Sequence, residues 1–207
     1  MIYKKENNNQ NISYVNDVEQ KEIEKTLEKM TEEDKKIVET RVYEMKKYPI
    51  HIILENIRSA FNVGAIFRTC DAAGIEKLWL TGITPYPPHN RIPKTALGAT
   101  ESVNWEYKKD IDEVLSQLRS KKIPIIAAEL TENAEIYTDF KFSGPVAIIF
   151  GHEVNGVEKS TIKKCSAVVK IPMHGLKESL NVEVSCGIIL FEIVRQLKTN
   201  SKSTLNQ

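Results

Sequence analysis

The chain has 207 residues, 41% hydrophobic and 28% charged, which suits one globular domain with an appendage. Its formal net charge of +1 excludes a polybasic protein but allows a local basic patch. Cys70, Cys165 and Cys186 are odd in number and form no Cys-x-x-Cys pair, which argues against disulfide and zinc frameworks. No apolar run approaches the roughly 20 residues that span a bilayer, and the first residues lack a secretory hydrophobic segment. We therefore expect a cytoplasmic protein with no membrane association.

Two kinds of segment precede residue 49. Residues 1 to about 16 are polar and rich in asparagine, a composition typical of disorder. Residues 17–47 are densely charged with apolar positions at helical spacing, and Thr31 begins a capping-box pattern for a second helix. Lysine and glutamate are mixed along both helices, which favours a solvated face over a surface that grips RNA. The sequence therefore predicts residues 1–48 as a disordered tail and helical N-terminal arm, and residues 49–207 as the main domain.

From residue 49 onward, strand-like and helix-like patterns alternate. Short apolar runs predict strands at 50–54, 77–81, 103–107, 124–129, 145–150 and 167–171. Helical patterns predict helices at 63–73, 111–120, 157–164 and about 181–198. Gly74 is expected to end the first helix and Asp110 to cap the second. The alternation predicts an α/β fold with a mostly parallel sheet.

Chemistry-bearing residues gather in three segments, each after a predicted strand: residues 56–69, 150–156 and 171–181. Open α/β sheets bind ligands at this edge. The third segment combines Pro172, a flexible Gly175 and a candidate N-cap, Ser179, before the last helix. This pattern predicts an irregular loop whose unpaired backbone groups are available to a ligand, although an ordinary connection between strand and helix is the alternative.

The first two segments also carry candidate side chains. Asn62 is placed to cap a helix, and Arg68 lies among apolar neighbours, so a buried arginine with either an anionic ligand or a structural ion pair is expected. Gly151 and Gly156 bracket Glu153, which also fits a tight turn with a surface carboxylate. No Gly-x-Gly-x-x-Gly follows the first strand, which argues against a dinucleotide fold. The four histidines lack metal-ligand spacing, so we expect no metal.

Taken together, the three segments resemble the motifs of a known family. They read Asn62-x-Gly-x-x-x-Arg68, Phe150-Gly-x-Glu-x-x-Gly156 and Ile171-Pro-Met-x-Gly-x-x-x-Ser-Leu-Asn-Val182. This order is similar to the SpoU/TrmH family of RNA ribose 2′-O-methyltransferases, of the SPOUT superfamily, over about residues 49–198. The resemblance implies a SPOUT-type α/β knot with a C-terminal deep trefoil knot. It also implies S-adenosyl-L-methionine held by loop backbone, and a homodimer with active sites at the subunit interface.

The resemblance also implies roles by position. The matching catalytic residues are Asn62, Arg68, Glu153, Ser179 and Asn181. The residues expected to line the cofactor pocket are Gly151, Ile171, Met173 and Leu180. One departure is Glu183, where the family usually has a small residue. Four cations surround the motifs and fit an RNA backbone path, although each alone also fits a solvated surface charge: Arg58, Arg91, Lys94 and Lys177.

The implied reaction is methyl transfer to a ribose 2′-hydroxyl of tRNA or ribosomal RNA. The family's arginine that matches Arg68 is often described as a general base. A guanidinium stays protonated at neutral pH, so we expect Arg68 to clamp the RNA phosphate and to stabilise the emerging alkoxide. Two alternatives are a noncatalytic RNA-binding protein with the same fold and a distant relative that methylates a base. The target nucleotide does not follow from the sequence.

Overall fold

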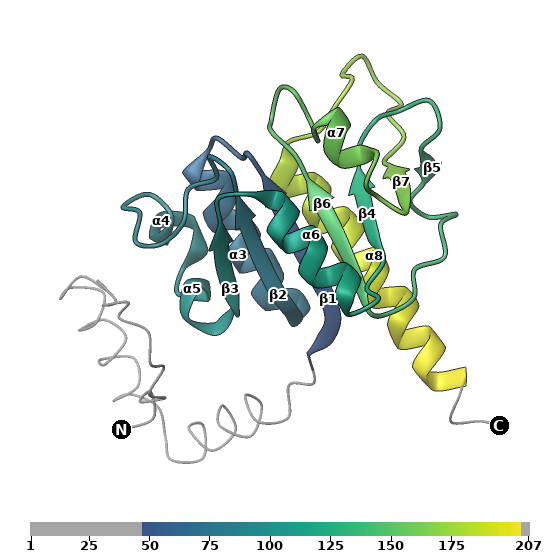
Figure 1. Cartoon of the computed structure of the whole chain (residues 1–207), viewed down its shortest axis with the longest axis horizontal. Helices are drawn as coiled ribbons and strands as arrows, with labels where there is room; N and C mark the ends of the chain where they lie inside the picture. The colour runs from purple at the N-terminus through teal and green to yellow at the C-terminus, as the bar shows by residue number, and fades with distance from the viewer. Residues whose placement is uncertain (1–46, 204–207) are drawn as a thin grey trace. The chain divides into compact units, whose positions relative to one another are not determined.

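A parallel β-sheet lies at the centre of the fold (Figure 1). The computed structural model describes residues 47–203, and within them seven strands pair in the order β3-β2-β1-β6-β4-β7-β5. Every adjacent pair is parallel. The strands are β1 Tyr48–Glu55, β2 Ile75–Thr81, β3 Trp105–Lys108, β4 Ile125–Ala128, β5 Glu135–Ile136, β6 Val146–Phe150 and β7 Ala167–Lys170. Parallel pairing brings the carboxyl ends of the strands to one edge of the sheet.

The two central strands are buried on both faces. Ile52, Ile53 and Leu54 of β1 are fully inaccessible, and every residue of β6 is buried. A continuous apolar run suits such a strand, because helices cover both sides and neither face meets water. Leu54 pairs with Phe150 in register. The segments that follow β1 and β6, which contain the first and second motifs, therefore begin side by side.

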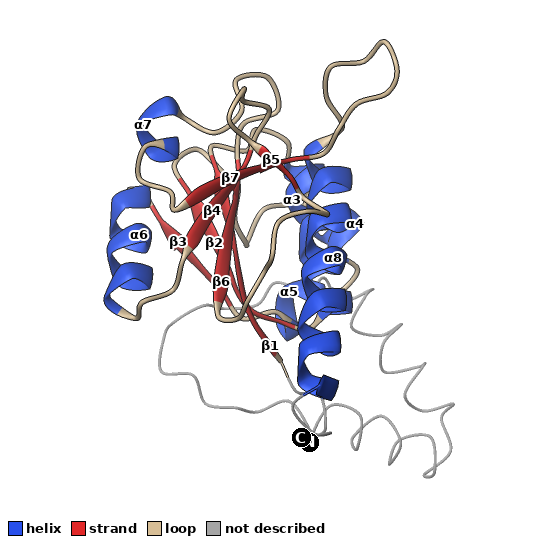
Figure 2. Ribbon diagram, turned by 90° about the vertical axis from the view of Figure 1, so that its right-hand side faces the viewer, coloured by secondary structure: helices blue, strands red, loops and turns tan. Residues whose placement is uncertain are grey.

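Helices cover both faces of the sheet (Figure 2). On one side lie α6 (Ile111–Ser120) and α7 (Lys159–Ile162); on the other lie α3 (Ala60–Ala73), α4 (Pro93–Ala96), α5 (Ala99–Ser102) and α8 (Val182–Ser203). Each side has its own apolar core: Leu115 and Trp79 belong to the core on the α6 side, and Phe67 and Ile189 to the core on the side of α3 and α8. Because α3 packs against α8, the helices that begin at the first and third motifs are held together.

The starts of α3 and α8 differ from the prediction. Ser59, not Asn62, caps α3: its hydroxyl accepts a hydrogen bond from the Asn62 N–H at 3.3 Å. Asn181, not Ser179, caps α8: its side-chain oxygen accepts from the Glu183 N–H at 2.8 Å. Several cap-forming residues occur near each start, and sequence preference alone does not choose among them. The Asn62 amide and the Ser179 hydroxyl are thereby left for other contacts.

The remaining predictions are largely confirmed. All six predicted strands are present, α6 has the predicted bounds with Asp110 as its cap, and Gly74 ends α3 with a φ of 66°. The sequence did not predict the short elements α4, α5 and β5, and α7 is shorter than expected. The expected tail and helical arm fall on residues 1–46, which lie outside the described residues. No helix of residues 47–203 is long and apolar enough to cross a membrane.

Candidate active site

The Glu153 carboxylate joins the second motif to the first. Oε2 accepts a hydrogen bond from the Arg58 backbone N–H, and Oε1 accepts from the Ser59 N–H and from Asn62 Nδ2, all at 2.9 Å. The donors lie between the end of β1 and the first turn of α3, where backbone N–H groups have no helical partner. A carboxylate from a distant loop therefore fixes the start of α3.

These contacts decide the protonation state of Glu153. Its partial burial favours a raised pKa, but the hydrogen bonds from Arg58, Ser59 and Asn62 outweigh burial and lower the pKa below its ordinary value of 4.5. The carboxyl is therefore ionised at neutral pH. An ionised carboxylate only accepts hydrogen bonds, so Glu153 is suited to positioning its donors and not to giving a proton.

Asn62 extends this connection to the third motif. Its Nδ2 donates to Glu153, while its Oδ1 accepts from Asn181 Nδ2 at 3.2 Å. Both ends of the amide are engaged, so its orientation is determined. The hydrogen-bonded chain Glu153–Asn62–Asn181 joins residues that are 91 and 119 positions apart in the sequence.

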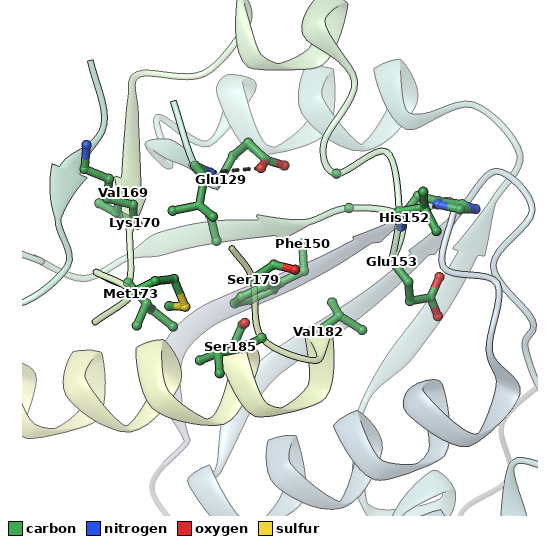
Figure 3. Close-up of a pocket in the computed structure, with 17 residues that line it drawn as sticks. Glu129, Phe150, His152, Glu153, Val169, Lys170, Met173, Ser179, Val182 and Ser185 are labelled. Atoms are coloured by element: carbon green, nitrogen blue, oxygen red, sulfur yellow. Dashed lines mark hydrogen bonds between the residues drawn. The ribbon is translucent and has the colours of Figure 1, made fainter. Parts of the chain in front are cut away.

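A pocket opens beside this chain, at the carboxyl ends of β4, β6 and β7 (Figure 3). All four residues expected to line the cofactor site line it: Gly151, Ile171, Met173 and Leu180. Glu153 and Ser179 line it as well, and Figure 3 shows Ser179 between Phe150 and the start of α8. The pocket therefore brings together residues from the second and third motifs. Asn62 of the first motif does not line it but is hydrogen-bonded to Glu153, which does.

Residues 151–156 form a tight turn in the pocket wall. His152 and Gly156 exchange two backbone hydrogen bonds, at 3.0 and 2.8 Å. A Cβ on Gly151 would lie 2.2 Å from the backbone of Gly156, and Gly156 itself has a φ of 68°. Both positions therefore require glycine. The turn has the expected shape, and its carboxylate, Glu153, points toward the first motif and not into bulk solvent.

Glu129 is a pocket residue that the sequence prediction did not include. It follows β4 directly, and its carboxylate accepts hydrogen bonds from the Leu130 N–H at 2.9 Å and the Val157 N–H at 2.7 Å. It thereby fastens the residue that follows the glycine turn to β4, and Figure 3 shows Glu129 in the pocket wall. The available signal was its position at the end of the predicted strand 124–129, at the ligand-binding edge that also selected the three motifs.

Arg68 lies outside this pocket, contrary to the prediction that it is buried. Its side chain is exposed, and its guanidinium has no hydrogen-bond or ion-pair partner among residues 47–203. It lines a second hollow with Lys94, Glu183 and Phe191. The first turn of α8 separates the two hollows, because Val182 lines the first and Glu183 the second. Sequence neighbours misled the prediction, since successive helical residues point about 100° apart.

The other expected RNA contacts are dispersed. Arg58, Arg91 and Lys177 are exposed, and Arg58 also gives its backbone N–H to Glu153. Neither Arg91 nor Lys177 lines either hollow. Within residues 47–203, no group of three or more histidine, cysteine, aspartate or glutamate side chains is placed to hold a metal ion. The polar side chains that line the pocket are carboxylates, hydroxyls, His152 and Lys170.

Known proteins share this sequence pattern. The profile of the SpoU rRNA Methylase family matches residues 49–191. The chain is 32% identical over 152 residues to the 23S rRNA (guanosine-2′-O-)-methyltransferase RlmB of Vibrio cholerae, which covers 73% of this chain and 61% of that protein. It is 32% identical over 145 residues to the tRNA (guanosine(18)-2′-O)-methyltransferase of Thermus thermophilus, which covers 70% of this chain and 74% of that protein.

Solved structures share the fold. The TrmH/SpoU tRNA modifying enzyme of A. aeolicus has a TM-score of 0.71 at 24% identity, over 80% of this chain and 86% of that one. The AdoMet-bound rRNA methyltransferase of Sinorhizobium meliloti has a TM-score of 0.66 at 26% identity, over 73% of this chain and 58% of that one. The chain thus spans about three fifths of the Vibrio and Sinorhizobium proteins. Since the family profile matches more than half of its residues, the chain belongs to the SpoU rRNA methylase family.

Proposed function

We propose that this protein transfers a methyl group from S-adenosylmethionine to a ribose 2′-hydroxyl of tRNA or ribosomal RNA. The observation that carries the proposal is the chain Glu153–Asn62–Asn181 at the rim of a pocket that all four expected cofactor residues line. The Vibrio and Thermus relatives are named for guanosine 2′-O-methylation of ribosomal RNA and tRNA, which supports the same class of reaction here.

The pocket has the chemistry that S-adenosylmethionine needs. Phe150, Val169 and Met173 offer apolar contact for an adenine ring and a carbon chain, and the backbone of the glycine turn offers polar groups. Ser179 adds a hydroxyl. When bound, the cofactor supplies an electrophilic methyl group. The bound AdoMet of the Sinorhizobium relative supports this choice of ligand.

The residues at the rim would orient the ribose. Asn62 and Asn181 present amide groups held by hydrogen bonds, and Glu153 keeps Asn62 in place as an ionised acceptor. Pre-set geometry of this kind lowers the barrier of a transfer reaction, because little reorganisation remains when the substrate arrives. Arg68 would remain cationic, hold an RNA phosphate and stabilise the developing alkoxide.

We also propose a homodimer in which Arg68 of one protomer serves the pocket of its partner. Within one chain, Arg68 lines a different hollow from the cofactor residues. Large apolar side chains are exposed around the starts of α3 and α8 and along α8: Phe61, Leu180, Val184 and Phe191 are 40–49% exposed. Contact with a second copy would cover this apolar surface. It would also bring Arg68, which has no partner in the described chain, to a pocket that has no arginine in its lining.

Within residues 49–207 we propose a deep trefoil knot. β7 pairs with β4 on one side and β5 on the other, and residues 129–134 connect β4 to β5. The chain that leaves β7 must pass this connection to reach α8. Passage through it would produce the knot, an exception to the usual avoidance of threading. Free thiols at Cys70, Cys165 and Cys186, together with RNA as substrate, support a cytoplasmic location.

The test is a methyl-transfer assay with purified protein, labelled S-adenosylmethionine, and tRNA or ribosomal RNA that lacks the modification. We expect label in RNA and a 2′-O-methylated nucleoside by mass spectrometry after digestion. RNA binding without cofactor binding in calorimetry would instead identify a noncatalytic RNA-binding protein. A methylated base in place of a methylated ribose would overturn the assignment of the acceptor atom.

A further inference from the structure

An exposed aromatic pair lies at the same sheet edge as the candidate active site but outside its pocket. Tyr86, in the loop after β2, stacks on Tyr107 of β3, with ring centroids 4.1 Å apart and planes 25° apart. The Tyr107 hydroxyl donates a hydrogen bond to the Gly82 carbonyl at 2.9 Å, which fixes the Tyr107 ring. Tyr86 is nevertheless 43% exposed. Tyr107 thus covers one face of the Tyr86 ring, and much of the rest of the Tyr86 side chain faces solvent.

The loop that carries Tyr86 is stiff and is fastened to the first motif. Pro85 and Pro87 flank the tyrosine and restrict its backbone. At the start of the loop, Thr84 Oγ1 accepts a hydrogen bond from the Ile57 N–H at 3.0 Å. Beyond its end, the Thr95 hydroxyl donates to the carbonyl of Phe61, the residue before Asn62, at 2.9 Å. A group bound on Tyr86 is therefore held in a fixed relation to the catalytic segment.

Three cations without ion-pair partners in the described residues occur in the segments that follow β1, β2 and β3. Arg91 in the same loop, Lys109 after β3 and Arg58 after β1 have exposed side chains, and none has an ion pair within the described part of the chain. Lys108 is different, because Glu106 and Glu113 neutralise it. Exposed aromatic rings beside unpaired cations recognise unpaired nucleobases and their phosphates, since every base has a stacking face and every linkage a negative charge.

We propose that Tyr86 is a stacking platform for an unpaired nucleobase of the RNA substrate. The inference rests on the proposed function and adds the class of substrate: the methylated nucleotide lies in a loop or bulge, beside a base that stacks on Tyr86. Strand order supports the arrangement. The platform stands over β2 and β3, the first motif follows the neighbouring β1, and the pocket lies beyond it over β6, β4 and β7.

The test measures fluorescence anisotropy of two labelled probes with the full chain: a short single-stranded oligoadenylate and an RNA duplex of the same length. We expect Tyr86→Ala to weaken binding of the single strand about 5- to 100-fold. Binding of the duplex should change less than about twofold, because its bases are stacked on one another and unavailable. Tyr86→Phe keeps the ring and should bind like the wild type. Calorimetry with S-adenosylmethionine and thermal unfolding should give wild-type values for both variants.

Three outcomes would overturn the platform: equal binding of the single strand by Tyr86→Ala and the wild type, equal weakening of both probes, or no preference of the wild type for the single strand. The proposed function has a separate test. A wild-type protein that binds the single strand through Tyr86 but methylates no RNA would refute the methyltransferase and leave the platform intact. A Tyr86→Ala variant that no longer binds the single strand but still binds S-adenosylmethionine would support the platform independently of the methyl-transfer reaction.

Discussion

The Glu153 carboxylate accepts hydrogen bonds from three donors of another segment. Substitution by glutamine removes its charge and nearly preserves its shape. Glu153→Gln turns one carboxylate oxygen into an NH₂ group that faces backbone N–H donors. We expect the free energy of unfolding to fall by about 1–3 kcal/mol at neutral pH, and methyl transfer to fall because Asn62 loses its anchor. Urea titration and initial rates measure the two effects. Glu132→Gln is the matched control, since Glu132 is exposed and has no hydrogen bond among residues 47–203.

The effect of Glu153→Gln should depend on pH with a definite sign. The native pKa of Glu153 lies below the ordinary value of 4.5. The carboxylate therefore contributes stability above that value, and the contribution is lost as the pH falls through the native pKa. The difference in unfolding free energy between wild type and variant should be constant near neutrality and shrink below about pH 4.5. A difference that instead grew in acid would contradict the hydrogen bonds assigned to this group.

Asn181 uses the two ends of its amide for different purposes. Its oxygen caps α8, while its nitrogen donates to Asn62. Asn181→Asp keeps a capping oxygen but cannot donate, so we expect stability within about 0.5 kcal/mol of the wild type. Methyl transfer should fall about 10- to 100-fold, since Asn62 is no longer held. Asn181→Ala also removes the capping oxygen, so its free energy of unfolding should fall by about 1 kcal/mol in addition to the fall in rate. Equal rates for wild type and Asn181→Asp would exclude the hydrogen-bonded chain from catalysis.

Two helical glycines allow a matched test of how the elements pack. A Cβ on Gly64 of α3 would lie 2.2 Å from Thr95 Oγ1 and 2.4 Å from the Ile92 carbonyl. A Cβ on Gly187 of α8 would meet only Thr69, at 3.8 Å. We expect Gly64→Ala to destabilise by about 1–3 kcal/mol and Gly187→Ala to stabilise by about 0.5–1 kcal/mol. Urea unfolding of both variants measures the difference, and a stabilising Gly64→Ala would show that α4 does not rest on α3.

The elements differ in how far the sequence predicted them. Strands such as β1 and β6 were predictable because long apolar runs fit only a sheet covered on both faces. Helix α6 was predictable because a capping residue, Asp110, precedes apolar residues at helical spacing. The elements α4, α5 and β5 have four residues or fewer, too few for a period to show. Of the site, the motifs contain some of the residues that line the pocket, among them Gly151, Ile171, Met173 and Leu180. The exposure of Arg68 and the contacts of Glu129 depend on distant segments, so no local pattern contained them.

At the scale of the whole molecule, the carboxyl edge of the sheet orders the parts of the site. The loop with Tyr86 follows β2, the first motif follows β1, the ionised Glu153 follows β6, and Glu129 follows β4. The strand order β3-β2-β1-β6-β4-β7 therefore runs from the proposed RNA platform toward the proposed cofactor pocket. Arg68 is the exception, because it lies across the first turn of α8. A partner subunit is the arrangement that would bring it back.

Subunit mixing decides whether Arg68 acts on the partner's pocket. In the proposed homodimer, we expect Arg68→Ala and Asn181→Asp each to impair both sites when every chain carries the same substitution. If Arg68 acts across the interface, a mixed dimer pairs the intact Asn181 of one chain with the intact Arg68 of the other, and one of its two sites works. With random exchange about half of the dimers are mixed, so we expect about a quarter of the wild-type rate to return. If Arg68 acted within its own chain, both sites of a mixed dimer would carry a defect. Mixing would then restore nothing, and the absence of recovery after exchange verified by mass spectrometry would refute the shared site.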